Sequence, residues 1–102
     1  MTLEDLFGTI LARKGADPGE SWTAQLLSKG PEKCAAKFGE EAIEAIIEAV
    51  KGDQEALKSE AADVLYHLLV MLAARDIHLN EVLSELDERQ KQSGITEKAG
   101  RN

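Results

Sequence analysis

Six acidic residues of this 102-residue chain fall into two groups whose residue types suit metal binding. The first group occupies nine positions and consists of Glu40, Glu41, Glu44 and Glu48. The second group, Glu60 and Asp63, lies in an otherwise apolar segment. Carboxylate oxygens are the ligands that Mg²⁺ prefers in proteins. The two groups are therefore either halves of one metal site or parts of a solvated surface, where acidic residues are common.

Two predicted helices carry these groups and are expected to form an antiparallel hairpin. Pro31 suits the first position of a helix over 31–51, because its missing N–H needs no partner there. Gly52 suits the end of that helix, since glycine adopts the left-handed conformation without strain. Asp53 suits the N-cap of the next helix, which extends to about residue 75.

The register of this hairpin places the two groups at the same height. Counted from Gly52, Glu44 lies eight residues before the turn and Glu60 eight after it. Glu41 and Asp63 lie eleven residues before and after it. A helix rises ~1.5 Å per residue and neighbouring helix axes lie ~8–10 Å apart. Four carboxylates can thus converge on one volume, where they would repel one another unless a cation such as Mg²⁺ were bound.

The apolar pattern of the second helix bears on the choice between site and surface. The helix over 31–51 is amphipathic, and its glutamates alone would be read as a solvated face. The helix over 53–75 is apolar almost all round, which predicts a buried helix, yet Glu60, Asp63 and His67 share one stripe of it. Buried carboxylates need a partner. That partner is a metal ion, a Lys or Arg, or water at an exposed edge.

The rest of the chain also predicts helices, so the expected fold class is all-α. Thr2 begins a capping box, Ser21 caps a short helix, and Asn80 is expected to cap a last helix to about residue 92. We expect one domain over 1–92 and a polar, mobile tail over 93–102. A helix that is apolar all round needs more cover than these helices supply, which predicts a homodimer that completes the bundle.

Composition excludes several classes of partner. The net charge of −7 argues against unaided binding to nucleic acid or to an anionic membrane. No apolar run approaches the ~20 residues of a membrane helix, and the N-terminus lacks the basic start of a signal peptide. The single cysteine, Cys34, allows no intrachain disulfide. A cytoplasmic location is the expectation.

The acidic pattern lies within a longer family resemblance. Glu40-Glu41-Ala-Ile-Glu44 followed by Glu60-Ala-Ala-Asp63 resembles the E-E-x-x-E and E-x-x-D motifs of the all-α, MazG-like nucleoside triphosphate pyrophosphohydrolases. The stretches SWTAQLL, KGPEKCAAKFGEEAIEAIIEA, SEAADVLYHLLVMLAARDI and EKAGR resemble the phosphoribosyl-ATP pyrophosphohydrolase family of histidine biosynthesis. The resemblance covers nearly the whole chain. Trp22 departs from it, since a tyrosine is expected there.

The resemblance implies a MazG-like helical bundle and the Mg²⁺-dependent hydrolysis of phosphoribosyl-ATP to phosphoribosyl-AMP and pyrophosphate. Carried over by position, it makes Glu41, Glu44, Glu60 and Asp63 the metal ligands, and Glu40 a supporting carboxylate that orients or deprotonates water. The alternative within this chemistry is a housecleaning pyrophosphatase acting on non-standard or deoxynucleotides. The alternative from another class is a non-catalytic helical dimerisation module whose acidic residues keep it soluble.

Several basic residues are candidates for contact with substrate phosphates. Lys37 and Lys29 approach the acidic groups along the chain, although Lys37 has a glutamate one turn on and can simply pair with it. Arg13 and Lys14 end the first helix, where cations favour the helix dipole in any case. His67 lies one turn beyond Asp63 and either hydrogen-bonds a ligand carboxylate or is a satisfied core histidine.

Overall fold

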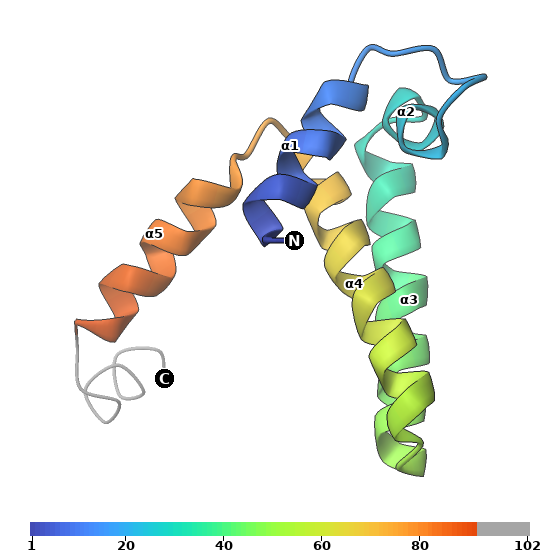
Figure 1. The fold of residues 1–102 in the computed structure, drawn as a ribbon, viewed down its shortest axis with the longest axis vertical. Helices are drawn as coiled ribbons and strands as arrows, with labels where there is room; N and C mark the ends of the chain where they lie inside the picture. Colours follow the sequence, from blue (N-terminus) through green and yellow to red (C-terminus); the bar gives the residue numbers. More distant parts are fainter. Residues whose placement is uncertain (92–102) are drawn as a thin grey trace.

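The computed structural model describes residues 1–91, and in that part of the chain it is entirely helical (Figure 1). The elements are α1 (Leu3–Arg13), α2 (Trp22–Ser28), α3 (Pro31–Lys51), α4 (Gln54–Ala74) and α5 (Leu79–Gln90). The predicted all-α class is confirmed. None of these five helices is long and apolar enough to cross a membrane. The predicted tail over 93–102 lies outside the described residues, so the division into domain and tail stays a prediction.

Helices α3 and α4 form the predicted antiparallel hairpin and pack along their whole lengths (Figure 1). Each has 21 residues and is therefore about 32 Å long. Gly52 ends α3 with φ 78°, in the left-handed region. The Asp53 carboxylate accepts a hydrogen bond of 3.0 Å from the backbone N–H of Ala56 and so caps α4. Both predicted caps are confirmed.

The predicted caps of the first two helices are confirmed as well. The Thr2 hydroxyl accepts from the Asp5 N–H at 3.0 Å, and the Asp5 carboxylate accepts from the Thr2 N–H at 3.1 Å. Ser21 Oγ accepts from the Ala24 N–H at 3.2 Å. These short-range signals are reliable because each cap satisfies backbone donors that the helix itself leaves unpaired.

The predicted start of the last helix is wrong. His78, not Asn80, is the N-cap of α5: its Nδ1 accepts from the Asn80 N–H at 3.1 Å. The Glu81 carboxylate accepts from the His78 N–H at 2.8 Å, which completes a capping box. The imidazole nitrogen provides the acceptor that Asn or Ser usually provides. The helix also ends at Gln90, two residues before the predicted position.

The hydrophobic core lies at one end of the hairpin. There α1 and α2 pack against the C-terminal half of α4 (Figure 1). The core residues are Phe7, Ile10, Leu26, Cys34, Leu69, Val70, Ala73 and Leu79. The other end of the hairpin, toward Gly52, extends beyond α1 and α2 and has no cover within residues 1–91. The prediction that α4 is buried all round is therefore wrong for its N-terminal half, where Ala61 and Ala62 are exposed, and Leu65 beyond them is also 44% exposed.

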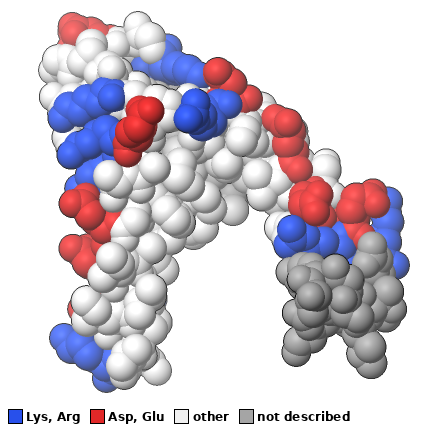
Figure 2. Space-filling model, turned by 180° about the vertical axis from the view of Figure 1, so that it is seen from behind, with Lys and Arg blue, Asp and Glu red and all other residues white. Residues whose placement is uncertain are grey.

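Helix α3 directs Glu41 and Glu48 toward α4 and several apolar side chains away from it. The Glu48 side chain, predicted to lie on the solvated face, is only 20% exposed. The most exposed apolar side chains of α3 are Ile43, Ile46, Ile47 and Val50, at 60%, 62%, 50% and 83%. We call these four residues the α3 outer face. Figure 2 shows a largely uncharged surface on this part of the hairpin, with charged side chains along its outer edge.

Candidate functional site

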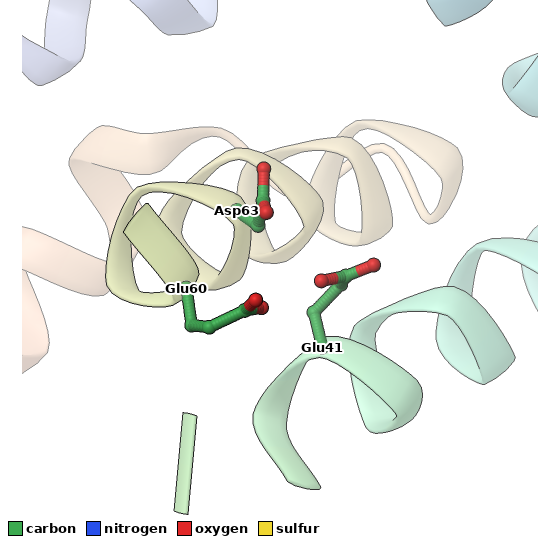
Figure 3. A group of neighbouring side chains, drawn as sticks. All are labelled: Glu41, Glu60 and Asp63. Carbon is green, nitrogen blue, oxygen red and sulfur yellow. The ribbon is translucent and has the colours of Figure 1, made fainter. Parts of the chain in front are cut away.

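Three carboxylates from the two acidic groups meet between α3 and α4. Glu41 comes from α3, and Glu60 and Asp63 come from α4 (Figure 3). One oxygen of each side chain lies within 4.8 Å of the corresponding oxygens of the other two. Figure 3 shows Glu41 and Glu60 pointing toward each other across the space between the helices. The hairpin register thus brings three of the four predicted ligands together.

Glu44 and Glu40 lie at the edge of this cluster. Glu44, the fourth predicted ligand, is exposed, and its charge raises the pKa of both Glu41 and Glu60. Glu40 is also exposed, and its carboxylate pairs with Lys37 Nζ at 3.4 Å. Asp63 is exposed as well, so the cluster is open to solvent.

The charges of the cluster are not balanced by any basic residue within residues 1–91. Burial raises the pKa of Glu60 to about 7, and the neighbouring Glu44 and Glu41 act in the same direction. The pKa of Glu41 is raised too, first by burial and then by Glu44 and Asp63. Among residues 1–91, no Lys or Arg forms an ion pair with Glu41, Glu60 or Asp63. A basic partner, one alternative to a metal ion, is thus not found there.

A divalent cation suits this donor set. The ligands are hard carboxylate oxygens, and Glu60 Oε2 is shielded from solvent without a hydrogen-bond donor among the described residues. Two oxygens bound to one ion lie up to twice the metal–oxygen distance apart, about 4–5 Å for Mg²⁺ or Ca²⁺. The oxygens of Glu41, Glu60 and Asp63 lie at most 4.8 Å apart, which is close to the separation that one bound ion requires. The cluster of acidic residues could therefore bind a metal ion.

Comparison with known proteins assigns the chain to a family. Residues 3–90 match the family described as Phosphoribosyl-ATP pyrophosphohydrolase. The chain belongs to the phosphoribosyl-ATP pyrophosphohydrolase family. A protein of Roseobacter denitrificans named Phosphoribosyl-ATP pyrophosphatase is 75% identical over 101 residues, which cover 99% of this chain and 96% of that protein. Proteins of Ruegeria pomeroyi and Jannaschia sp. with the same name are 75% and 71% identical, each over 97% of this chain and 94% and 97% of their own lengths.

The family match includes the whole candidate site. The matched residues 3–90 contain the α3–α4 hairpin with Glu41, Glu60 and Asp63. The family resemblance predicted from the acidic motifs is therefore confirmed. The terminal EKAGR stretch, which also supported that resemblance, lies beyond both the matched and the described residues.

His67 lies deep in the hairpin of this family member, next to the site. It is 5% exposed, and its Nδ1 has no hydrogen-bond partner among the described residues. Burial lowers the pKa of His67, and the charge of Lys37 lowers it further, whereas Asp63 and Glu40 oppose that shift. The ring is therefore predominantly neutral at pH 7. The charge of Asp63 therefore acts on His67. A role of His67 in orienting Asp63 stays a prediction.

The four predicted phosphate contacts lie in different places. Lys37 is beside the cluster, paired with Glu40. Lys14 donates a hydrogen bond of 2.8 Å to the Ala73 carbonyl and pairs with Asp76, at the far end of α4 from the cluster. Arg13 is in the last turn of α1, and Lys29 is the exposed C-cap residue of α2. Only Lys37 is therefore placed next to the carboxylates.

One contact near the site has no signal in the sequence. The hydroxyl groups of Thr23 and Tyr66 share a hydrogen bond that joins α2 to α4 across 43 positions. The Tyr66 ring in turn packs edge-on against His67, with 4.9 Å between ring centroids. No pattern links Thr23 with Tyr66, because the contact depends on how α2 docks. The bond supports the part of α4 that follows Asp63.

We expect the affinity of this chain for a divalent cation to fall about tenfold when the pH is lowered from 8 to 6. The reason is that protons compete with the cation for the Glu60 carboxylate, whose pKa is about 7. In the cation-free protein the raised pKa means that the folded state binds this proton more tightly than the unfolded chain. The contribution of Glu60 to stability therefore falls as the pH rises from about 4.5 to about 7. Calorimetric titration with Mg²⁺ at both pH values measures the affinity. An affinity that is the same at pH 6 and pH 8 would contradict this role for Glu60.

Proposed function

We propose that this chain hydrolyses phosphoribosyl-ATP to phosphoribosyl-AMP and pyrophosphate, a step of histidine biosynthesis. The proposal rests on the convergence of Glu41, Glu60 and Asp63 in a member of the phosphoribosyl-ATP pyrophosphohydrolase family. Relatives that are 71–75% identical over nearly the whole chain carry the name of this activity. The cytoplasmic location expected for such a biosynthetic enzyme stays a prediction.

Mg²⁺ is the proposed cofactor, held by Glu41, Glu60 and Asp63 with Glu44 beside them. Mg²⁺ prefers few protein carboxylates and keeps other positions for water and phosphate oxygens, which matches a cluster that is open at the Glu44 side. When bound, the ion would offset the polyphosphate charge and stabilise pyrophosphate as it leaves. Without substrate, it would also offset the burial and the neighbouring negative charges that raise the pKa of Glu60 and Glu41.

The remaining residues of the site position water and phosphate. Glu40 is exposed at the mouth of the cluster, so its carboxylate can orient a water molecule or accept a proton from it. Lys37 Nζ, 3.4 Å from that carboxylate, holds it and supplies a positive charge for a phosphate group. Direct attack by water is favoured, since Cys34 is fully buried, donates to the Leu26 carbonyl, and has its thiol pKa raised by burial. A buried thiol of raised pKa is a poor nucleophile.

A comparison of pyrophosphate release from different nucleotide substrates tests this proposal. The metal cluster contacts only phosphates, so the housecleaning alternative would use the same residues on a different nucleotide. We expect pyrophosphate release from phosphoribosyl-ATP in the presence of Mg²⁺ to exceed release from any ribo- or deoxynucleoside triphosphate in a panel at equal concentration. Turnover of deoxynucleotides without turnover of phosphoribosyl-ATP would support the housecleaning activity instead. Turnover of none, with no saturable Mg²⁺ binding, would support the non-catalytic module.

A homodimer is the second part of the proposal, and the shape of the chain supports it. The chain exposes 6957 Å², whereas a compact monomer of 11.1 kDa exposes about 5,700 Å². The radius of gyration is 15.8 Å, against about 13 Å for a compact domain of this length. The excess of roughly 1,300 Å² is larger than the ~800 Å² that each partner buries in an interface of standard size.

The α3 outer face is the proposed place for the second copy. Its four side chains, Ile43, Ile46, Ile47 and Val50, are all at least half exposed and adjoin one another at helical spacing. A contiguous apolar face of this kind is typical of a surface that is buried on association. The site lies on the opposite side of the same helix, so a dimer formed through this face would support α3 without blocking the carboxylates.

A further inference from the structure

Helix α5 projects from the body of the molecule as an arm. Beyond its first residue, Leu79, it has almost no contact with the other helices of the described part (Figure 1). Its apolar residues fall on one side at spacings of one, three and four positions and include Val82, Leu83 and Leu86. Leu83 and Leu86 are 38% and 49% exposed. An amphipathic helix of 12 residues is marginal in water unless its apolar side is covered.

The direction in which α5 leaves the body is fixed by packing. Leu79 is buried at 4% exposure, and the His78 ring packs edge-on against Phe7 with 5.1 Å between centroids. Asp76 turns the chain with φ 59° and is paired with Lys14 from α1. These contacts hold the first turn of α5 against α1. The arm is therefore held away from its own hairpin rather than free to fold back onto it.

The arm and the hairpin lie on either side of one hollow. Figure 2 shows both projecting in the same direction from the core, with the largely uncharged surface of the hairpin beside the hollow. The α3 outer face and the apolar side of α5 are thus two unpartnered surfaces of one chain that do not reach each other.

We propose that α5 is exchanged between two copies of this chain, so that its apolar side, Val82, Leu83 and Leu86, packs on the α3 outer face of the partner subunit. The inference rests on the homodimer proposed above and specifies which surfaces meet. With two-fold symmetry each arm covers the hairpin of the other copy, so both unpartnered surfaces are buried at once. The partner then fills the hollow that each copy leaves open.

The sizes and charges of the two surfaces match. The apolar side of α5 from Val82 to Leu86 extends over about 6 Å of helix axis, and the α3 outer face from Ile43 to Val50 over about 10 Å, so the first fits within the second. Two acidic residues lie within this stretch. Glu48 is only 20% exposed and is turned toward α4, and the exposed Glu44 lies on the side of the helix that carries Glu41. On α5, Ser84 and Glu88 lie opposite the apolar side and would remain in water. No charged side chain therefore has to enter the centre of the contact.

Cysteine cross-linking of the full chain tests the exchange. Ile47→Cys and Leu86→Cys are made in separate chains, one of them tagged, and the two proteins are mixed and oxidised. Cys34 does not interfere because it is fully buried. We expect the mixed dimer, one chain of each kind, to be the main covalent product. Ser84→Cys in place of Leu86→Cys is the matched control and should lose that product.

Light scattering adds a measurement that does not depend on cross-linking. We expect Leu86→Glu to shift the apparent mass from dimer toward monomer, and Ser84→Glu, which adds the same charge on the other side of α5, to leave it unchanged. Three results would overturn the exchange. They are a wild-type chain that is a monomer, Ile47→Cys chains that cross-link mainly to each other, and a single chain carrying both Ile47→Cys and Leu86→Cys that forms the disulfide within itself. Hydrolysis of phosphoribosyl-ATP by the wild-type chain is measured separately, so loss of the proposed activity and loss of the exchange are distinguishable.

Discussion

Glu60→Gln is expected to lower the rate of phosphoribosyl-ATP hydrolysis roughly a hundred- to thousandfold, the effect of losing several kcal/mol of transition-state charge stabilisation. Glutamine keeps the size of the side chain and removes the negative charge that binds the cation. Mg²⁺ should raise the melting temperature of the wild-type chain and not that of the variant. Steady-state kinetics and thermal unfolding with and without Mg²⁺ measure both effects.

Glu55→Gln is the matched control for this substitution. It makes the same chemical change on the same helix, but Glu55 is exposed at the start of α4 and pairs with Lys58 at 2.7 Å. We expect its activity and its Mg²⁺ response to match those of the wild-type chain. Equal activity of Glu60→Gln and wild type, with no Mg²⁺-dependent stabilisation of either, would favour a non-catalytic helical module over the proposed enzyme.

The position of the acidic cluster could be predicted because it depends on local rules. Gly52 and Asp53 fix the turn, and helical rise then fixes which residues are level on the two arms. The register brings Glu41, Glu60 and Asp63 within 4.8 Å. Glu44 is not among the three side chains whose oxygens meet within this distance, although it acts on the pKa of Glu41 and Glu60 and so lies beside them.

The features that the sequence did not predict depend on tertiary packing. The His78 cap was missed because an imidazole nitrogen accepts a hydrogen bond there in place of the expected asparagine. The Thr23–Tyr66 bond needs α2 docked on α4. Periodicity correctly separated the acidic from the apolar side of α3, but it placed the acidic side in solvent. In the structure Glu41 and Glu48 of that side face α4, and the four residues of the α3 outer face are exposed instead.

This rotation of α3 suits the proposed metal site. Carboxylates that bind a metal ion between two helices must face the partner helix, and the opposite side of the same helix then faces outward. Because that outward side is the α3 outer face, the chain combines a polar interface inside the hairpin with an apolar surface outside it. The proposed metal site and the proposed dimer surface are thus two consequences of one orientation of α3.

Ile46→Asp should separate metal binding from dimer formation. Ile46 is 62% exposed in the single chain, so aspartate there has little effect on the packing of one chain. In a dimer it would put an unpaired charge into an apolar contact, which we expect to weaken association by at least about a hundredfold, or roughly 3 kcal/mol. Sedimentation or light scattering across a range of protein concentrations measures the dissociation constant.

Lys33→Asp is the control for Ile46→Asp, because Lys33 is an exposed residue of α3 outside the outer face. It should leave the dimer intact. Unchanged association of Ile46→Asp would contradict the proposed interface. If the dimer dissociates and Mg²⁺ still binds, the carboxylate cluster is complete within one hairpin, as the convergence of Glu41, Glu60 and Asp63 in a single chain predicts. If Mg²⁺ binding is lost together with the dimer, the second copy is needed to hold α3 in the rotation that points its carboxylates at α4.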